Sequence, residues 1–199
     1  MTQLGTMHAH SFATDPKHLC FVLARYHFVA RMLAGAKSVL EVGCGDCTGA
    51  HVVKPVVGFW RGLDANPAMA RPNEVWTADV LAGPVPTCAG GPWRAVYSLD
   101  VLEHIAPENE DRFFENINAS LNPGGTCIIG MPSLESQPYA SEESRKHHVN
   151  CKTEDGLRKT LKRHYENVFL FGLNDCTLHT GFGPLCHYRL AVCLNKIEG

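Results

Sequence analysis

The stretch VLEVGCGDCTG, residues 39–49, joins a short apolar run to three glycines and two cysteines. The aliphatic residues of 38–42 predict a buried strand. Gly43, Gly45 and Gly49 then predict a tight turn in which no side chain blocks approach to the main chain, with a helix directly afterwards. This order is typical of a ligand-binding corner. A structural strand-to-helix turn remains the alternative, because a glycine-rich match alone is weak evidence.

The composition favours one soluble globular domain. The chain has 199 residues, of which 45% are hydrophobic, and we expect a single domain over 1–199 with a flexible segment at 1–16. Its net charge of −2 gives no reason to expect a nucleic-acid partner. Neither a secretory leader pattern nor an apolar run of about 18 residues is evident. We therefore expect a cytoplasmic protein that does not bind a membrane.

Nine cysteines are scattered along the chain, and several lie inside apolar runs. Cys44 and Cys47 have the spacing of a redox or metal pair, but no second pair of this spacing completes a zinc site. Free cysteine often behaves as a small buried hydrophobe. Reduced, structural thiols are the favoured interpretation.

Strand-like and helix-like segments alternate over most of the sequence. This alternation predicts a mostly parallel sheet covered by helices on both faces. The last two strands have no helix between them and predict an antiparallel hairpin at the sheet edge. The expected strands are 38–42, 57–64, 73–81, 94–99, 126–132, 167–175 and 186–196, and the expected helices include 17–33, 108–121 and 153–164.

Carboxylates follow or end four of these strands. They are Glu41, Asp64, Asp79 and Asp100. In a parallel sheet, ligands bind beyond the carboxyl ends of the strands, so we expect these acids to surround a site. Asp64 follows Glu41 at close to the interval of about 20 residues that is typical of a ribose-binding acid. One or two of them could instead cap helices, although four at successive strand ends make that a poor account of the whole set.

With these motifs, the sequence resembles the class I S-adenosylmethionine-dependent methyltransferases over nearly its full length. The similarity is carried by LEVGCGDCTG, GLDAN, TADVL, YSLDVLEHI and LNPGGTCIIGMP. The last two are most similar to the branch that includes the ubiquinone-biosynthesis O-methyltransferases, and small glycan-modifying methyltransferases are also similar. The resemblance implies an α/β fold of Rossmann-like, doubly wound type, with seven strands and an antiparallel C-terminal hairpin. Cys47 departs from the pattern, because a third glycine often stands there.

The resemblance implies S-adenosylmethionine as the cofactor. The cofactor-binding residues it implies are Glu41, Gly43, Cys44, Gly45, Asp64, Ala65, Asp79, Val80 and Leu99. A nicotinamide-dependent oxidoreductase is an alternative for the fold, but the glycine spacing is one residue longer than its motif requires. A non-catalytic binding module is a third alternative, which would be expected to lose the acids.

Methyl transfer to a hydroxyl requires a group that removes a proton. If DVLEHI is helical, Asp100 and His104 lie one turn apart on one face, and we expect His104 to be the base and Asp100 to orient it. Glu103 is a weaker candidate for the same role. A structural histidine at a helix start is the competing interpretation.

Polar residues in the C-terminal third are candidates for binding the acceptor: His148, Asn150, His179 and His187. With His104 they could also hold a divalent metal that polarises two neighbouring hydroxyls. Surface histidines are the alternative interpretation, so metal dependence stays open. We expect a small-molecule acceptor, with a sugar or glycan precursor first and an aromatic or quinone-like hydroxyl second.

Overall fold

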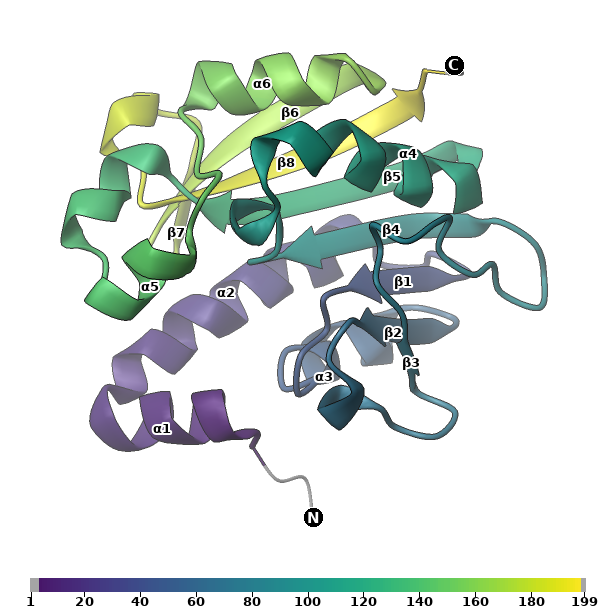
Figure 1. The fold of residues 1–199 in the computed structure, drawn as a ribbon, viewed down its shortest axis with the longest axis horizontal. Coiled ribbons are helices and arrows are strands. Elements are labelled where there is room, and N and C mark those ends of the chain that lie inside the picture. The colour runs from purple at the N-terminus through teal and green to yellow at the C-terminus, as the bar shows by residue number, and fades with distance from the viewer. Residues whose placement is uncertain (1–3, 198–199) are drawn as a thin grey trace.

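A computed structural model describes residues 4–197 of the chain. Eight strands form one sheet in the order β3-β2-β1-β4-β5-β8-β6-β7 (Figure 1). The strands are β1 (Val39–Val42), β2 (Trp60–Asp64), β3 (Val75–Thr77), β4 (Trp93–Leu99), β5 (Leu121–Pro132), β6 (Tyr165–Asn174), β7 (Thr177–His179) and β8 (Tyr188–Lys196). The α-helices are α1 (Thr6–Thr14), α2 (Pro16–Met32), α3 (Ala50–Val53), α4 (Glu110–Ser120), α5 (Glu142–His147) and α6 (Glu154–Lys162).

The first five strands pair in parallel, so their carboxyl ends share one edge. β8 lies between β5 and β6 and is antiparallel to both. The mostly parallel α/β fold with antiparallel C-terminal strands is therefore confirmed. The predicted number of seven strands is wrong, because the short edge strand β7 adds an eighth to the sheet. Three residues of mixed polarity carry too little periodicity to be recognised as a strand.

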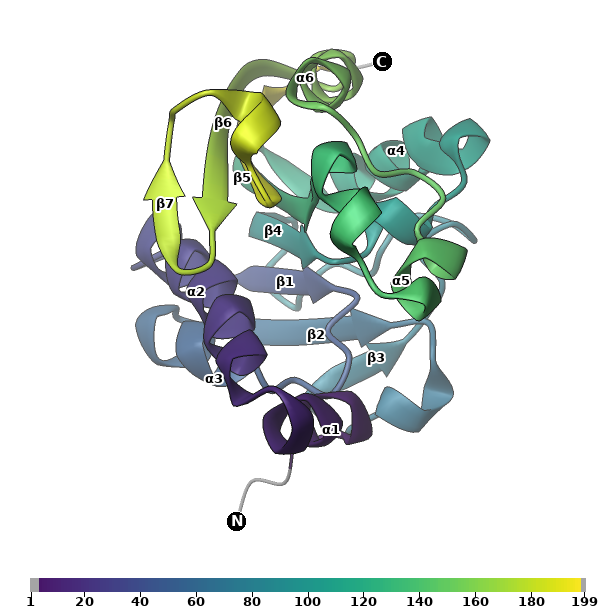
Figure 2. The same cartoon turned by 90° about the vertical axis from the view of Figure 1, so that its left-hand side faces the viewer.

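Alternation along the central strands sends apolar side chains to both faces of the sheet. Leu40 and Val42 contribute to a core with Phe113 and Phe114 of α4, while Val39 contributes to a second core with α2 and α3. Figure 2 shows α2 and α3 on one side of the sheet and α4 on the other. A sheet buried on both faces needs near-continuous apolar strands, and the sequence supplies them.

Residues 6–14, within the segment 1–16 that the sequence predicts to be flexible, form α1, and residues 1–3 lie outside the described part of the chain. Asp46, in the turn after β1, anchors this region. Its Oδ2 accepts hydrogen bonds from the Gly5 N–H and His8 Nδ1, both at 2.8 Å. Burial acts to raise the pKa of Asp46, but hydrogen bonds from His8 and Thr48 outweigh it and hold that pKa well below its usual range. The N-terminal helix is thus attached to the glycine turn.

None of the helices within residues 4–197 combines the length and the hydrophobicity that crossing a membrane requires.

Candidate functional site

The turn after β1 has the left-handed backbone that its glycines predict. Gly43 has φ +78° and Gly45 has φ +49°. The N–H groups of Gly43 and Cys44 donate to Leu63 O of β2, at 2.7 and 3.2 Å, which holds the turn against the neighbouring strand. A Cβ at Gly45 would have no atom within 4 Å, so the main chain there is open to a ligand.

Asp64 ends β2 and connects this turn to the next one. Its Oδ2 accepts the Gly45 N–H at 2.8 Å, and its Oδ1 accepts the Asn66 N–H at 2.9 Å. Each carboxylate oxygen can accept a further hydrogen bond. Asp64 therefore both braces the glycine turn and presents acceptors at the carboxyl edge, and the adjacent Ala65 is exposed.

Glu41 lies beneath the turn rather than in the open. Its side chain is 1% exposed and accepts hydrogen bonds from the hydroxyls of Tyr26, at 2.9 Å, and Tyr97, at 2.6 Å. Trp60 Nε1 donates to the same Tyr97 hydroxyl at 3.0 Å. Burial raises the pKa of Glu41 to about 8, although the two tyrosine hydrogen bonds act to lower it. These buried hydrogen bonds suit a structural role in which Glu41 supports the turn that follows β1.

The other three predicted cofactor residues at the strand ends have different surroundings. Asp79 is exposed and lies two residues beyond β3, where its Oδ1 accepts the Leu81 N–H at 2.8 Å. Val80 and Leu99 are buried in the two cores. The acid at this strand end is thus accessible, whereas the two apolar side chains belong to the hydrophobic cores.

Cys44 and Cys47 are both buried, and the Sγ atoms of both face the Gly45 carbonyl oxygen, at 3.9 and 3.8 Å. Cys47 has φ +60°, a backbone conformation that side chains rarely adopt, which explains why a glycine is common at this position. Within residues 4–197 neither thiol belongs to a group of three potential metal ligands. The structural role of these cysteines stays a prediction.

The predicted helical relation of Asp100 and His104 is wrong. Only residues 102–104 form a turn of 3₁₀ helix, η3 (Leu102–His104), and Asp100 precedes it with φ +56°. The Asp100 carboxylate instead accepts Arg25 Nη1 on both oxygens at 2.8 Å. The Arg25 guanidinium also lies 3.9 Å from the centre of the Tyr188 ring. Asp100 therefore pairs with α2 and does not orient His104.

His104 lies beside His148, with ring centres 5.1 Å apart. His104 Nδ1 is 3.0 Å from His147 O, and its side chain is 44% exposed. Glu103 is 1% exposed, and within the described residues neither carboxylate oxygen has a hydrogen-bond partner. Burial, followed by repulsion from Asp100, raises the pKa of Glu103 well above its usual range. Burial and the neighbouring His104 lower the pKa of His148.

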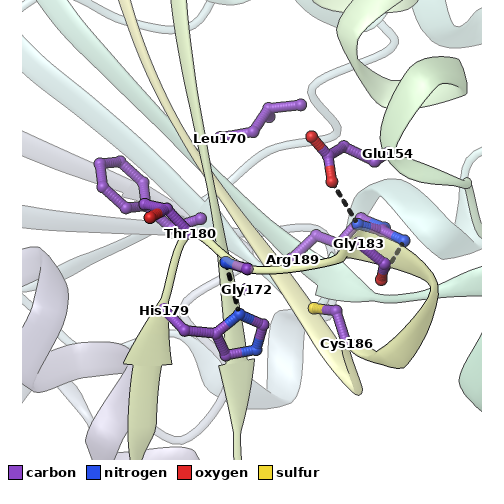
Figure 3. Close-up of a pocket in the computed structure, with 10 residues that line it drawn as sticks. Glu154, Leu170, Gly172, His179, Thr180, Gly183, Cys186 and Arg189 are labelled. Atoms are coloured by element: carbon purple, nitrogen blue, oxygen red, sulfur yellow. Dashed lines mark hydrogen bonds and ion pairs between the residues drawn. The ribbon is translucent and has the colours of Figure 1, made fainter.

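The remaining predicted acceptor residues are not part of this group. Asn150 is buried, and its Nδ2 donates to Glu110 Oε2 at 3.2 Å. His187 is exposed and lies 3.9 Å from Asp175. His179 ends β7 and lines a small pocket with Glu154, Cys186 and Arg189, in which Arg189 is paired with Glu154 (Figure 3).

Two important residues were missed by sequence reasoning, and a third was underrated. Arg25 is 75 positions from Asp100, and no spacing signal joins them. Gln137, whose Oε1 lies 2.9 Å from His148 Nδ1, is in a polar stretch of sequence without a recognisable pattern. The sequence indicates Glu103 only as a weaker candidate for the base, although its position directly before His104 is a signal that the two side chains could share a site.

Comparisons with known proteins show the family and the fold of the chain. A family model described as "Methyltransferase domain" matches residues 15–166. No curated protein matches the sequence. Many solved structures share the fold, among them a SAM-dependent methyltransferase from Archaeoglobus fulgidus, with 15% identity, TM-score 0.70, and 97% of this chain and 100% of that one covered.

Two further structures have related folds. A possible histamine N-methyltransferase from Thermotoga maritima has 15% identity and TM-score 0.67, with 94% of this chain and 99% of that one covered. A complex of DhpI with SAM and HEP has 15% identity and TM-score 0.64, with 94% and 91% covered. At this identity these similarities concern the fold.

Proposed function

Because the chain belongs to the methyltransferase-domain family, with 152 of its 199 residues matched (15–166), we propose that it transfers a methyl group from S-adenosylmethionine to a hydroxyl of a small molecule. The resemblance inferred from the sequence motifs is confirmed at the level of the family. The same match argues against the nicotinamide-dependent alternative for this fold. The acceptor proposed is a sugar or a glycan precursor.

The residues at the carboxyl edge fit this cofactor. The left-handed turn at Gly43 and Gly45 leaves the main chain open at Gly45, where an added Cβ would meet nothing within 4 Å. Asp64, fixed by two main-chain N–H groups, keeps acceptor capacity for a pair of ribose hydroxyls. The exposed carboxylate of Asp79 is available to an adenine edge. The bridge from Asp64 to Gly45 is the observation that carries the proposal.

When bound, S-adenosylmethionine supplies a methyl group on a positively charged sulfur. An acceptor oxygen forms the new O–CH₃ bond as the S–CH₃ bond breaks, the bonding pair stays on sulfur, and the hydroxyl proton is lost. The protein has to align the hydroxyl and accommodate that proton. We assign the alignment of the hydroxyl, and the assistance of its proton loss, to the group of Glu103, His104 and His148, which lie on the segments after β4 and after α5.

The segment after β4 lies directly against the glycine turn. A Cβ at Gly43 would approach Val101 Cγ2 to 2.2 Å, and Val101 is two residues before Glu103. The acceptor-side polar group is therefore next to the proposed cofactor site. A polar surface of this kind suits a polyhydroxylated acceptor, whereas an aromatic or quinone-like hydroxyl would favour an apolar one.

Calorimetry with S-adenosylmethionine and its demethylated product tests the cofactor half of the proposal. Asp64→Ala should weaken binding by more than about 1 kcal/mol, since hydrogen bonds to the ligand are lost. Asp155→Ala, an exposed aspartate at the start of α6, is the matched control and should bind like the wild type. Folded wild-type protein that binds neither compound contradicts the proposal.

A panel of acceptors with labelled cofactor tests the other half. Nucleotide sugars and free glycosides should be methylated, and catechols should be poor acceptors. Transfer to catechols without transfer to any sugar would select the aromatic alternative.

A further inference from the structure

We propose that Glu103, His104 and His148 bind one divalent first-row transition-metal ion at the acceptor side of the active site. One ligand atom from each lies within 4.8 Å of the others, and no other such group of three occurs in residues 4–197. The role of this ion rests on the proposed methyl transfer, whereas its binding is a separate property of the three side chains.

Glu103 gives the strongest indication that something is bound here. It is 1% exposed, and within the described residues both of its carboxylate oxygens lack a hydrogen-bond partner. A buried polar group without a partner is costly, and buried charges in proteins are paired or coordinate metals. The ring of His104 lies beside it, with Nε2 4.0 Å from Glu103 Oε1.

Each of the two histidine rings makes a hydrogen bond through Nδ1 that leaves Nε2 available as a ligand atom. His104 Nδ1 donates to the His147 carbonyl oxygen at 3.0 Å. His148 Nδ1 donates to Gln137 Oε1 at 2.9 Å, and Gln137 Nε2 donates to Ser133 O at 3.2 Å, which fixes the amide with its oxygen toward His148. In each neutral ring the proton then resides on Nδ1 and the lone pair on Nε2. Metal-binding histidines donate their other N–H to a carbonyl or carboxylate in the same way.

The main chain fixes the two halves of the group against each other. The N–H groups of Val149 and Asn150 donate to Glu103 O, at 2.8 and 3.0 Å. The segment after α5, which carries His148, is thereby attached to η3, although 45 positions separate Glu103 from His148 in the sequence. With bonds of about 2.1 Å, two ligands on a tetrahedral ion lie about 3.4 Å apart, so small side-chain rotations would close the group around an ion.

The ligand set points to the class of ion. Two imidazoles and one carboxylate suit Zn²⁺, Co²⁺, Mn²⁺ or Fe²⁺, whereas Mg²⁺ and Ca²⁺ prefer oxygen ligands. Three protein ligands leave further coordination positions open. His104 is 44% exposed, and Val101, two residues before Glu103, contacts Gly43, so the group itself lies near both solvent and the glycine turn.

An ion held there would act as a Lewis acid on the acceptor. A hydroxyl bound to it loses its proton more readily, and that proton passes to a solvent water. The oxygen lone pair then forms the O–CH₃ bond while the S–CH₃ bond breaks with its pair left on sulfur. No electron is gained or lost by the metal. Neighbouring hydroxyls, as on a sugar, can occupy two open positions together, which gives the acceptor a fixed orientation.

Binding of Co²⁺ to the full-length, untagged protein, stripped of metal with a chelator, tests the proposal without any turnover. Calorimetry and the visible absorption of bound Co²⁺ should both report one ion per chain. Glu103→Gln and His148→Ala should each weaken binding by about 100-fold or more, because even the outer-shell partners of metal ligands are worth about 10–100-fold. His147→Ala is the matched control, since this exposed neighbour pairs with Glu143 and should leave binding unchanged.

Thermal unfolding and S-adenosylmethionine binding, measured on the same samples, separate the possible failures. Should Glu103→Gln not fold, His148→Ala decides, because His148 is only half-buried. Wild type that fails to bind Co²⁺, or equal binding by folded His148→Ala, overturns the metal site while leaving the methyl-transfer proposal intact. Co²⁺ binding without S-adenosylmethionine binding supports the site and contradicts the proposed function.

Discussion

Gly43 packs against Val101 so closely that a Cβ on the glycine would lie 2.2 Å from Val101 Cγ2. This contact joins the turn after β1 to the segment after β4, two parts of the sheet edge that are 58 positions apart in sequence. Gly43 also has φ +78°, so a side chain there is disfavoured for two independent reasons. The proposed cofactor site and the proposed acceptor site therefore meet at the contact between Gly43 and Val101.

Gly43→Ala should destabilise the protein by more than about 2 kcal/mol, from left-handed strain and from overpacking. Chemical denaturation measures this loss. The double variant with Val101→Ala should recover the overpacking part. Gly35→Ala is the control for strain alone, because Gly35 has φ +81° and nothing within 4 Å of an added Cβ. Equal losses at Gly43 and Gly35 would show that the contact with Val101 has no energetic effect.

The sequence predicted the parts of the molecule that depend on local pattern. The strands β1, β2, β4 and β5 come from aliphatic runs, and the turn at Gly43 and Gly45 from the residues that left-handed backbone requires. The departure noted at Cys47 has a physical basis in its φ of +60°.

The parts that sequence reasoning missed depend on contacts between distant segments. No pattern indicates that Asp100 meets Arg25 of α2, since a lone aspartate after a strand looks the same with or without a partner. The hydropathy of Glu103 predicts an exposed side chain, because the residue is charged, yet this side chain is buried. His148 joins His104 only because main-chain bonds to Glu103 O align the two segments.

Cys47→Gly should change the free energy of unfolding by no more than about 1 kcal/mol. Relief of the left-handed backbone, worth roughly 1–2 kcal/mol, offsets the loss of a buried thiol. Cys127→Gly, at a buried position in β5 without positive φ, should cost clearly more. Metal analysis should find the same zinc content in purified wild type and in Cys47→Gly. A lower zinc content in Cys47→Gly would show that Cys44 and Cys47 bind a metal ion.

The stability of the protein should depend on pH through Glu41. Burial raises the pKa of Glu41 from an ordinary 4.5 to about 8 in the folded protein. Between these values the folded state holds a proton that the unfolded state has released. The free energy of unfolding should therefore fall as pH rises from about 4.5 to 8, by at most about 1.4 kcal/mol per pH unit from this group.

Glu41→Gln removes this titrating group while keeping a side chain that the Tyr26 and Tyr97 hydroxyls can contact. Denaturation measured at several pH values should give a flatter profile for Glu41→Gln than for wild type. Glu115→Gln, an exposed residue of α4, serves as the control and should follow the wild type. Parallel profiles for Glu41→Gln and wild type would mean that Glu41 is ionised in the folded protein.

The pairing of Arg25 with Asp100 gives the last prediction. Each side chain is partly exposed, 15% and 34%, so the energy of the pair lies between that of a surface ion pair and that of a buried one. Stacking of Arg25 on Tyr188 holds the guanidinium in place and lowers the entropy cost of pairing. A double-mutant cycle of Arg25→Met and Asp100→Asn should therefore give a coupling of about 1–2 kcal/mol in the free energy of unfolding. The same cycle with Asp79→Asn, whose carboxylate caps its own turn, should give none. A coupling near zero for Arg25 and Asp100 would show that their ion pair adds nothing to the free energy of unfolding.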